Sequence, residues 1–233
     1  MTDEHHDRDK EKEESQQEQA EEQEKDMSSS VDSILQARLK LEEEKASLDK
    51  MLKEKFQKNI TVMFTDIKGS TSYFETFGDV EGRAMVQRHN AMLFPIIEKH
   101  GGKVIKTIGD AIMATFEDSA GGVKAGMEMQ NKLHDYNKEQ DQKHLRIMIR
   151  IGLNYGPAVV EENDVFGDAV NVAARVESQA DAEELLISDS LYKEVRSEEE
   201  ILVRFFGDVT VKGKAEPVKL YRVMWSEDQL IAE

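Results

Sequence analysis

The sequence predicts an α+β domain of ferredoxin-like type, in which an antiparallel-centred sheet carries helices on one face. Two observations lead to this prediction. From residue 59 onward, short runs of β-branched and apolar residues typical of strands alternate with longer segments of helical periodicity. The order of these segments is βααββαβ, followed by further strands, and this order is typical of a ferredoxin-like sandwich.

Turn residues mark several boundaries between the expected elements. Gly101-Gly102 ends a helix, and Gly109-Asp110 separates two short apolar runs, as in a tight hairpin. Gly156-Pro157 likewise separates two strands. We expect helices at 80–100, 118–140, 170–178 and 189–196, and strands at 59–66, twice within 103–116, twice within 145–162, and at 185–188, 201–213 and 218–225.

The chain divides by composition into a leader and one folded domain. Its 233 residues carry 31 Lys and Arg against 48 Asp and Glu, a formal charge of −17, and residues 1–26 alone hold 12 acids and 4 bases. Because residues 1–27 have too few apolar side chains to offset the loss of chain entropy, we expect a disordered acidic tail. We expect a helix in residues 28–56, the folded domain in residues 57–226, and a C-terminal tail in residues 227–233.

The expected N-terminal helix has a short heptad pattern. Ile34, Leu41 and Leu48 recur every seven residues, but Arg38 and Lys45 interrupt the companion line of apolar positions. Two interpretations remain open. The helix either pairs with its twin in a coiled coil or packs one stripe on its own domain.

Composition excludes several classes of protein. A strongly acidic chain is unsuited to neutralising phosphates, so we expect no nucleic-acid partner. The absence of cysteine excludes a disulfide scaffold, a thiol nucleophile and a cysteine metal site. No run of 18 apolar residues occurs and the N-terminus is acidic, so we expect no membrane insertion and a soluble, cytoplasmic protein.

Two aspartates are the first candidates for chemistry. Asp66 ends the expected strand at 59–66, and Asp110 lies in the expected hairpin turn. Each alone has a simpler explanation, Asp66 as the cap of the next helix and Asp110 as a turn former. If both lie at one edge of the sheet, their carboxylates repel unless a cation sits between them, which predicts a divalent metal site.

The residues after Asp66 are suited to a phosphate group. Gly69, Ser70 and Thr71 open a helix, whose first backbone N–H groups have no partner within the helix. Such a helix start suits a polyphosphate, and the neighbouring carboxylate suits the Mg²⁺ that accompanies it.

A second pair of candidates lies near the middle of the chain. Asn171 and Arg175 are four residues apart and therefore project from one face of a helix. An amide and a guanidinium on one face can orient a sugar and contact a phosphate oxygen. The simpler alternative is a surface helix in which Arg175 pairs with an acid such as Glu177.

Four segments together resemble the signature motifs of the class III nucleotide cyclase catalytic domain. They occur in the family's order within about residues 57–226: FTDIKGST (64–71), KTIGDAIM (106–113), DVFGDAVNVAAR (164–175) and VKGKAEPVKLY (211–221). One such segment is a weak signal, because short Gly-Asp strings are common, but four in order are specific. The resemblance implies the cyclase fold and an enzyme that makes a 3′,5′-cyclic nucleotide and pyrophosphate.

The resemblance also implies a metal site. By it, Asp66, Asp110 and the backbone carbonyl of Ile67 would hold two Mg²⁺ or Mn²⁺ ions. The ribose 3′-hydroxyl would then attack the α-phosphorus in line.

Further roles follow from the same resemblance. Asn171 would position the ribose, and Arg175 would stabilise charge on the α-phosphate. Lys212, or its neighbour Lys214, would contact the terminal phosphates. The sites would be shared across a head-to-tail homodimer, with the metal aspartates from one chain and the other groups from its partner.

Two residues predict which base is bound. Lys106 only donates hydrogen bonds and ionised Asp164 only accepts them. Adenine presents an acceptor at N1 beside a donor at its 6-amino group, whereas guanine presents the reverse. The pair therefore predicts ATP as substrate and adenylate cyclase as the activity.

Several alternatives stay open. Guanylate cyclase is one, and a transferase that makes cyclic dinucleotides is disfavoured by the Lys106 and Asp164 pair and by the absence of a GGDEF or GGEEF string. A non-catalytic nucleotide-binding dimerisation module is the third. Gly156-Pro157 lies closer to Asp164 than in many members of the family, and Phe166 stands where Trp is frequent, which leaves the dimer contact open. The activating signal is not predicted.

Overall fold

The computed structural model describes residues 33–52, 55–162, 164–210, 217–226 and 229. The chain forms two compact units, Met1–Lys55 and Phe56–Glu233. In the first unit, residues 33–52 form a helix, and both interpretations of its apolar positions, the coiled coil and the packing on its own domain, stay predictions. The expected acidic tail lies outside the described residues. In the part of the chain that is described, no helix combines the length and the apolar composition needed to cross a membrane.

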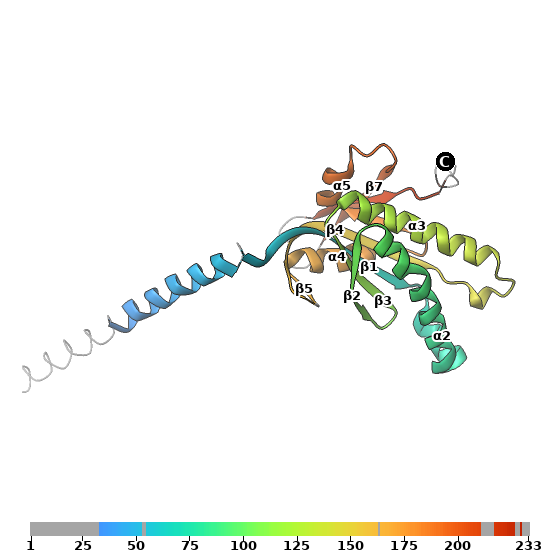
Figure 1. Ribbon diagram of the computed structural model, residues 1–233, viewed down its shortest axis with the longest axis horizontal. Coiled ribbons are helices and arrows are strands. Elements are labelled where there is room, and N and C mark those ends of the chain that lie inside the picture. Colours follow the sequence, from blue (N-terminus) through green and yellow to red (C-terminus); the bar gives the residue numbers. More distant parts are fainter. Residues whose placement is uncertain (1–32, 53–54, 163, 211–216, 227–228, 230–233) are drawn as a thin grey trace, which may run out of the picture. The chain divides into compact units, whose positions relative to one another are not determined.

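One sheet runs through the second unit (Figure 1). Among the described strands, only the pairing of β4 with β6 is parallel, so the sheet is mainly antiparallel, as predicted. The short strand β5 (Val165–Phe166) pairs with β4. The other strands lie in the order β2 (Gly102–Ile108), β3 (Ala111–Phe116), β1 (Gln57–Ile67), β4 (Ile149–Val160), β6 (Leu185–Ser188), β8 (Val218–Val223) and β7 (Val203–Val209).

Helices cover both faces of the sheet. Met63 of β1 shares a buried cluster with Leu93 and Met129 from the helices of one face. Val62 shares a cluster with Ala173 of α4 (Asp168–Gln179) on the other face. The expectation of helices on one face is therefore wrong for α4. The reason is that β1 is apolar at successive positions and needs cover on both sides. The helices are α2 (Ser70–Lys99), α3 (Ser119–Lys138), α4 (Asp168–Gln179), α5 (Asp189–Val195) and a short 3-10 helix, η1 (Lys143–Leu145).

Helix α2 begins earlier than the segment expected at 80–100. It starts at Ser70 and bends at Gly78, whose backbone has a φ of 83° and is not helical. Two helices are thus joined end to end, in agreement with the αα part of the predicted order. The early start places the first turn of α2 directly after Asp66.

Strand β4 differs from the two strands expected around Gly156-Pro157, because it runs through both residues without a break. Proline lacks the N–H that a central strand position needs. Pro157 is tolerated because it pairs with Asn59 of β1 on one side only, while β6 and β5 pair with other parts of β4.

Candidate metal and nucleotide site

The end of β1 and the β2–β3 turn bring Asp66 and Asp110 to one edge of the sheet. Asp110 follows Gly109, whose φ of 66° lies in the left-handed region that glycine adopts without strain. The backbone N–H of Ile67 donates a hydrogen bond to Asp110 Oδ2 at 3.2 Å. This bond ties the turn to the strand end beside Asp66, so the two predicted carboxylates are neighbours.

Arg150, which the sequence reasoning missed, supplies a cation beside these carboxylates. It lies opposite Asp66 in the β1–β4 register. Its Nε donates to Asp66 Oδ2 at 2.9 Å, and its Nη2 lies 2.8 Å from the same oxygen. Asp66 therefore does not cap α2, whose first turn follows Gly69 without any side-chain cap. The available signal in the sequence was Arg150 itself, a charged residue between the apolar residues Ile149 and Ile151.

Glu177 of α4 lies on the other side of the Arg150 guanidinium. The Oε1 of Glu177 is 2.6 Å from Arg150 Nε. This oxygen accepts no hydrogen bond among the described residues, because the N–H of Arg150 Nε is directed at Asp66. Burial raises the pKa of the Glu177 carboxyl to about 7, against the attraction of Arg150 and with a further increase from Asp66 and Asp110. Burial thus outweighs the nearby cation. Arg175, in contrast to the alternative considered above, is not the partner of Glu177.

The raised pKa of Glu177 predicts a pH-dependent stability. The usual pKa of the group is 4.5, so the folded chain holds this proton more tightly than the unfolded chain does. Stability is therefore lost as pH rises from 4.5 through 7, by up to about 3 kcal/mol. We expect Glu177→Gln to be more stable than wild type above pH 7 and equal to it below pH 4.5, in chemical denaturation with a chelator present.

The matched control is Glu194→Gln, which changes an exposed carboxylate of α5. It should leave the free energy of unfolding unchanged at every pH. A stability difference between Glu177→Gln and wild type that does not vary with pH would contradict the raised pKa.

The donor set suits Mg²⁺ or Mn²⁺ better than a softer metal. Among the described residues, no group of three or more acidic, histidine or cysteine side chains is gathered for a metal. Two carboxylates, those of Asp66 and Asp110, stand beside the start of α2. Mg²⁺ is commonly bound by one or two carboxylates together with substrate phosphates. The site therefore fits a hard divalent ion that arrives with a polyphosphate.

The structure also assembles the predicted base-reading pair. Lys106 of β2 and Asp164, which precedes β5, are 58 positions apart in the sequence. The Lys106 Nζ donates to both carboxylate oxygens of Asp164, at 2.7 and 2.8 Å. These bonds, with a further one from the backbone N–H of Val165, hold the pKa of Asp164 below its usual value. A fixed donor and a fixed acceptor thus stand side by side.

Helix α4 packs very closely on β4. A Cβ atom at Gly152 would lie 2.0 Å from the backbone nitrogen of Glu177, so only glycine permits this approach. Side chains two residues apart on a helix point about 200° away from each other. Glu177 faces Arg150, and Arg175 therefore points away from it, on the same side as Asn171.

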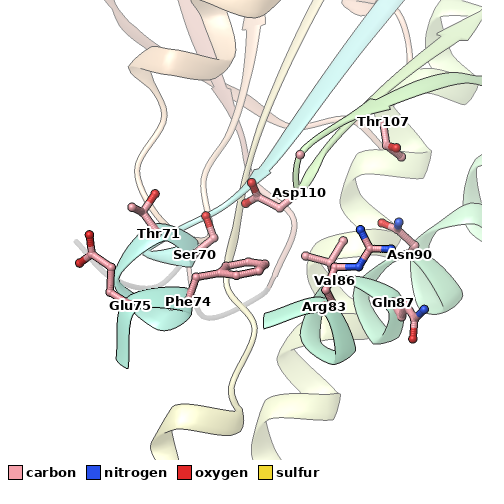
Figure 2. Close-up of a pocket in the computed structure, with 11 residues that line it drawn as sticks. Ser70, Thr71, Phe74, Glu75, Arg83, Val86, Gln87, Asn90, Thr107 and Asp110 are labelled. Atoms are coloured by element: carbon pink, nitrogen blue, oxygen red, sulfur yellow. The ribbon is translucent and has the colours of Figure 1, made fainter. Parts of the chain in front are cut away.

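The remaining predicted residues fall into three groups. No hydrogen bond or ion pair among the described residues joins the side chain of Asn171 or Arg175 to Asp66 or Asp110. Ser70 and Thr71 open α2 and line a cavity with Asp110 (Figure 2). The predicted phosphate contact at Lys212, and the alternative at Lys214, lie outside the described residues.

A protein-family model and several curated proteins match this chain. A family model described as the adenylate and guanylate cyclase catalytic domain matches residues 52–224. An adenylate cyclase of Anabaena cylindrica is 32% identical in an alignment of 184 positions that covers 71% of this chain and 37% of that protein. The serine/threonine-protein kinase pkn2 of Myxococcus xanthus is 30% identical over 164 residues, which are 70% of this chain and 20% of that protein. The chain therefore spans well under half the length of these two curated relatives.

Solved structures that resemble this chain include a cyclase. The crystal structure of the adenylyl cyclase CyaB from P. aeruginosa superposes on this chain with a TM-score of 0.66 at 28% identity. The superposition covers 73% of this chain and 96% of that one.

Proposed function

Because this chain belongs to the adenylate and guanylate cyclase catalytic domain family, we propose that it is an adenylate cyclase that converts ATP to 3′,5′-cyclic AMP and pyrophosphate. The observation that carries the choice of ATP is the ion pair between Lys106 and Asp164. We assign the catalytic domain to residues 57–226.

The ion pair supplies the two groups that adenine needs. Lys106 donates to the N1 acceptor, and Asp164 accepts from the 6-amino group. Guanine would place its N1 donor against the ammonium and its O6 acceptor against the carboxylate. Both mismatched groups would then be desolvated without a partner, which disfavours GTP.

Asp66, Asp110 and the carbonyl of Ile67 are proposed to hold two Mg²⁺ or Mn²⁺ ions, which when bound supply charge stabilisation on the phosphates and a lower pKa for the ribose 3′-hydroxyl. The Nη2 of Arg150 lies 2.8 Å from Asp66 Oδ2, and this guanidinium is proposed to donate also to a terminal phosphate oxygen. The first N–H groups of α2, with the hydroxyls of Ser70 and Thr71, offer further donors.

The chemical step closes a cyclic phosphodiester. The 3′-oxygen forms a bond to the α-phosphorus as its proton passes to solvent water, and the bond from the α-phosphorus to the pyrophosphate oxygen breaks, so that pyrophosphate leaves. Arg175 is proposed to donate to the α-phosphate as negative charge builds there. Asn171 holds the ribose, and Lys212 contacts the terminal phosphates.

A head-to-tail homodimer is proposed because, among the described residues, no hydrogen bond or ion pair joins Asn171 or Arg175 to the aspartates of the same chain. Helical geometry turns the side chains of Asn171 and Arg175 away from the Glu177 face of α4, which supports a role toward the aspartates of a partner. Two exposed apolar side chains lie two positions from the members of the base-reading pair, and their exposure supports an interface with a second chain at this surface. Ile108 of β2 is 55% exposed and Phe166 of β5 is 49% exposed.

The direct test is incubation of the purified full chain with ATP or GTP and Mn²⁺, followed by chromatography. We expect cyclic AMP and pyrophosphate from ATP, with at least about a tenfold preference over GTP. Cyclic GMP as the main product would identify a guanylate cyclase, and cyclic dinucleotides would identify a different transferase. Nucleotide binding without any product would identify a binding module.

A base-switched variant tests the reading of adenine. In Lys106→Glu/Asp164→Ser, the pocket accepts from guanine N1 and donates to O6, so the preference for ATP over GTP should fall by at least about tenfold. The measurement is the ratio of kcat/KM for the two nucleotides. Lys132→Glu is the matched control, since Lys132 is an exposed lysine of α3, and it should leave the ratio unchanged. An unchanged ratio in the double variant would contradict base reading by this pair.

A further inference from the structure

A cavity of about 580 Å³ lies between α2 and the β2–β3 turn (Figure 2). The function proposed above uses only its Ser70, Thr71 and Asp110 side. The rest of its wall has no role in that function. It comes from α2 on both sides of Gly78, from β2 and from the β2–β3 turn. It consists of Phe74, Glu75, Arg83, Val86, Gln87, Asn90, Thr107 and Gly109.

Hydrogen-bond donors gather on one side of this cavity. Figure 2 shows the guanidinium of Arg83 beside the Asn90 side chain, with Gln87 and Thr107 on the same side. Among the described residues, no ion pair or side-chain hydrogen bond engages Arg83, Gln87 or Thr107. These side chains can therefore donate to a bound molecule.

His89 fixes the direction in which Asn90 donates. The imidazole is fully buried, and burial lowers its pKa despite the hydrogen bond to Asn90, so the ring is neutral. Its Nδ1 lies 2.9 Å from Asn90 Oδ1, and an N–H at this position donates to the amide oxygen. The oxygen of Asn90 is thereby engaged, and its NH₂ group is left to donate to the cavity.

Charge and shape restrict the ligand class. The lining has one cation, Arg83, and two acids, Glu75 and Asp110, so it disfavours a dianionic phosphate more strongly than a monoanion. A planar carboxylate carries a single charge and matches a guanidinium with two parallel hydrogen bonds. Phe74 and Val86 supply an apolar wall of the kind that most small-molecule pockets have.

We propose that this cavity binds an organic monocarboxylate with an apolar body. Its carboxylate lies against Arg83, Asn90 and Thr107, and its apolar part lies against Phe74 and Val86. The ligand thereby connects α2 to the β2–β3 turn that carries Asp110. This binding site goes beyond the proposed cyclase activity and does not require it.

Benzoate is the probe, and binding to the full chain is measured without metal by calorimetry and by ligand-observed NMR. We expect benzoate to bind wild type and to bind Arg83→Gln at least tenfold more weakly. Arg88→Gln is the matched control, because Arg88 is an exposed arginine of the same helix that does not line the cavity. It should bind benzoate as wild type does. Benzamide, the neutral analogue, and inorganic phosphate should each bind at least tenfold more weakly than benzoate.

Hydrogen exchange locates the bound probe. Benzoate should slow exchange in peptides that cover residues 80–90 and 104–111, and not in those that cover β7 and β8. Protection confined to other segments, or equal affinity of wild type and Arg83→Gln, overturns the assignment. Displacement of benzoate by a non-hydrolysable ATP analogue with Mn²⁺ also overturns it, because the cavity would then belong to the nucleotide site. None of these readouts depends on cyclase turnover, so they remain informative if the proposed activity fails.

Discussion

Asp66→Ala is expected to lower the rate of cyclic AMP formation at least about a thousandfold, because loss of a metal ligand removes several kcal/mol of transition-state stabilisation. The chain should remain folded. Asp66 lies at a half-exposed strand end, and after its removal Arg150 still has the Glu177 carboxylate 2.6 Å away. The measurements are kcat with saturating Mn²⁺ and a circular dichroism melting curve.

The matched control for this variant is Asp208→Ala, which removes an exposed aspartate from β7 at the far edge of the sheet. It should retain wild-type turnover. Asp110→Ala should reproduce the loss seen with Asp66→Ala. More than a few per cent of wild-type activity in either site variant would rule out the two-metal assignment.

A mixture of two inactive variants is expected to recover about a quarter of wild-type activity. In a head-to-tail homodimer, Asp66→Ala damages the metal half of each site and Arg175→Ala damages the other half. In a mixed dimer both changes fall in one site, and the second site is whole. Random exchange makes about half of the dimers mixed, each with one intact site of two, which gives about a quarter of the full activity.

Subunit exchange has to be verified independently, for example by a mass tag on one variant. Each variant alone should stay inactive at every concentration, and activity should appear on mixing with the time course of exchange. A mixture that exchanges without regaining turnover would show that each chain holds a complete site. Asn171 and Arg175 would then act on their own chain's aspartates.

Much of the fold follows from local patterns. The apolar run at 59–66 predicted a central strand, and the two glycines after residue 100 predicted the end of a helix. Both are found, as β1 and as the end of α2. The break expected between two strands at Gly156-Pro157 is absent. A proline fits in a strand where no neighbouring strand needs its missing N–H. Only the sheet shows that the second side of β4 is open at Pro157.

The sequence by itself determined most of the order of the elements, the two aspartates beside a helix start, and the residue types of the proposed base-reading pair. It could do so because periodicity, turn residues and motif spacing are properties of short segments. The tertiary structure alone decided which distant side chains meet. Arg150 reaches Asp66 across 84 positions, through the antiparallel register of β1 and β4. Glu177 joins them because Gly152 lets α4 approach the sheet, and burial there raises its pKa. Such contacts depend on register and layer packing, which no local pattern encodes.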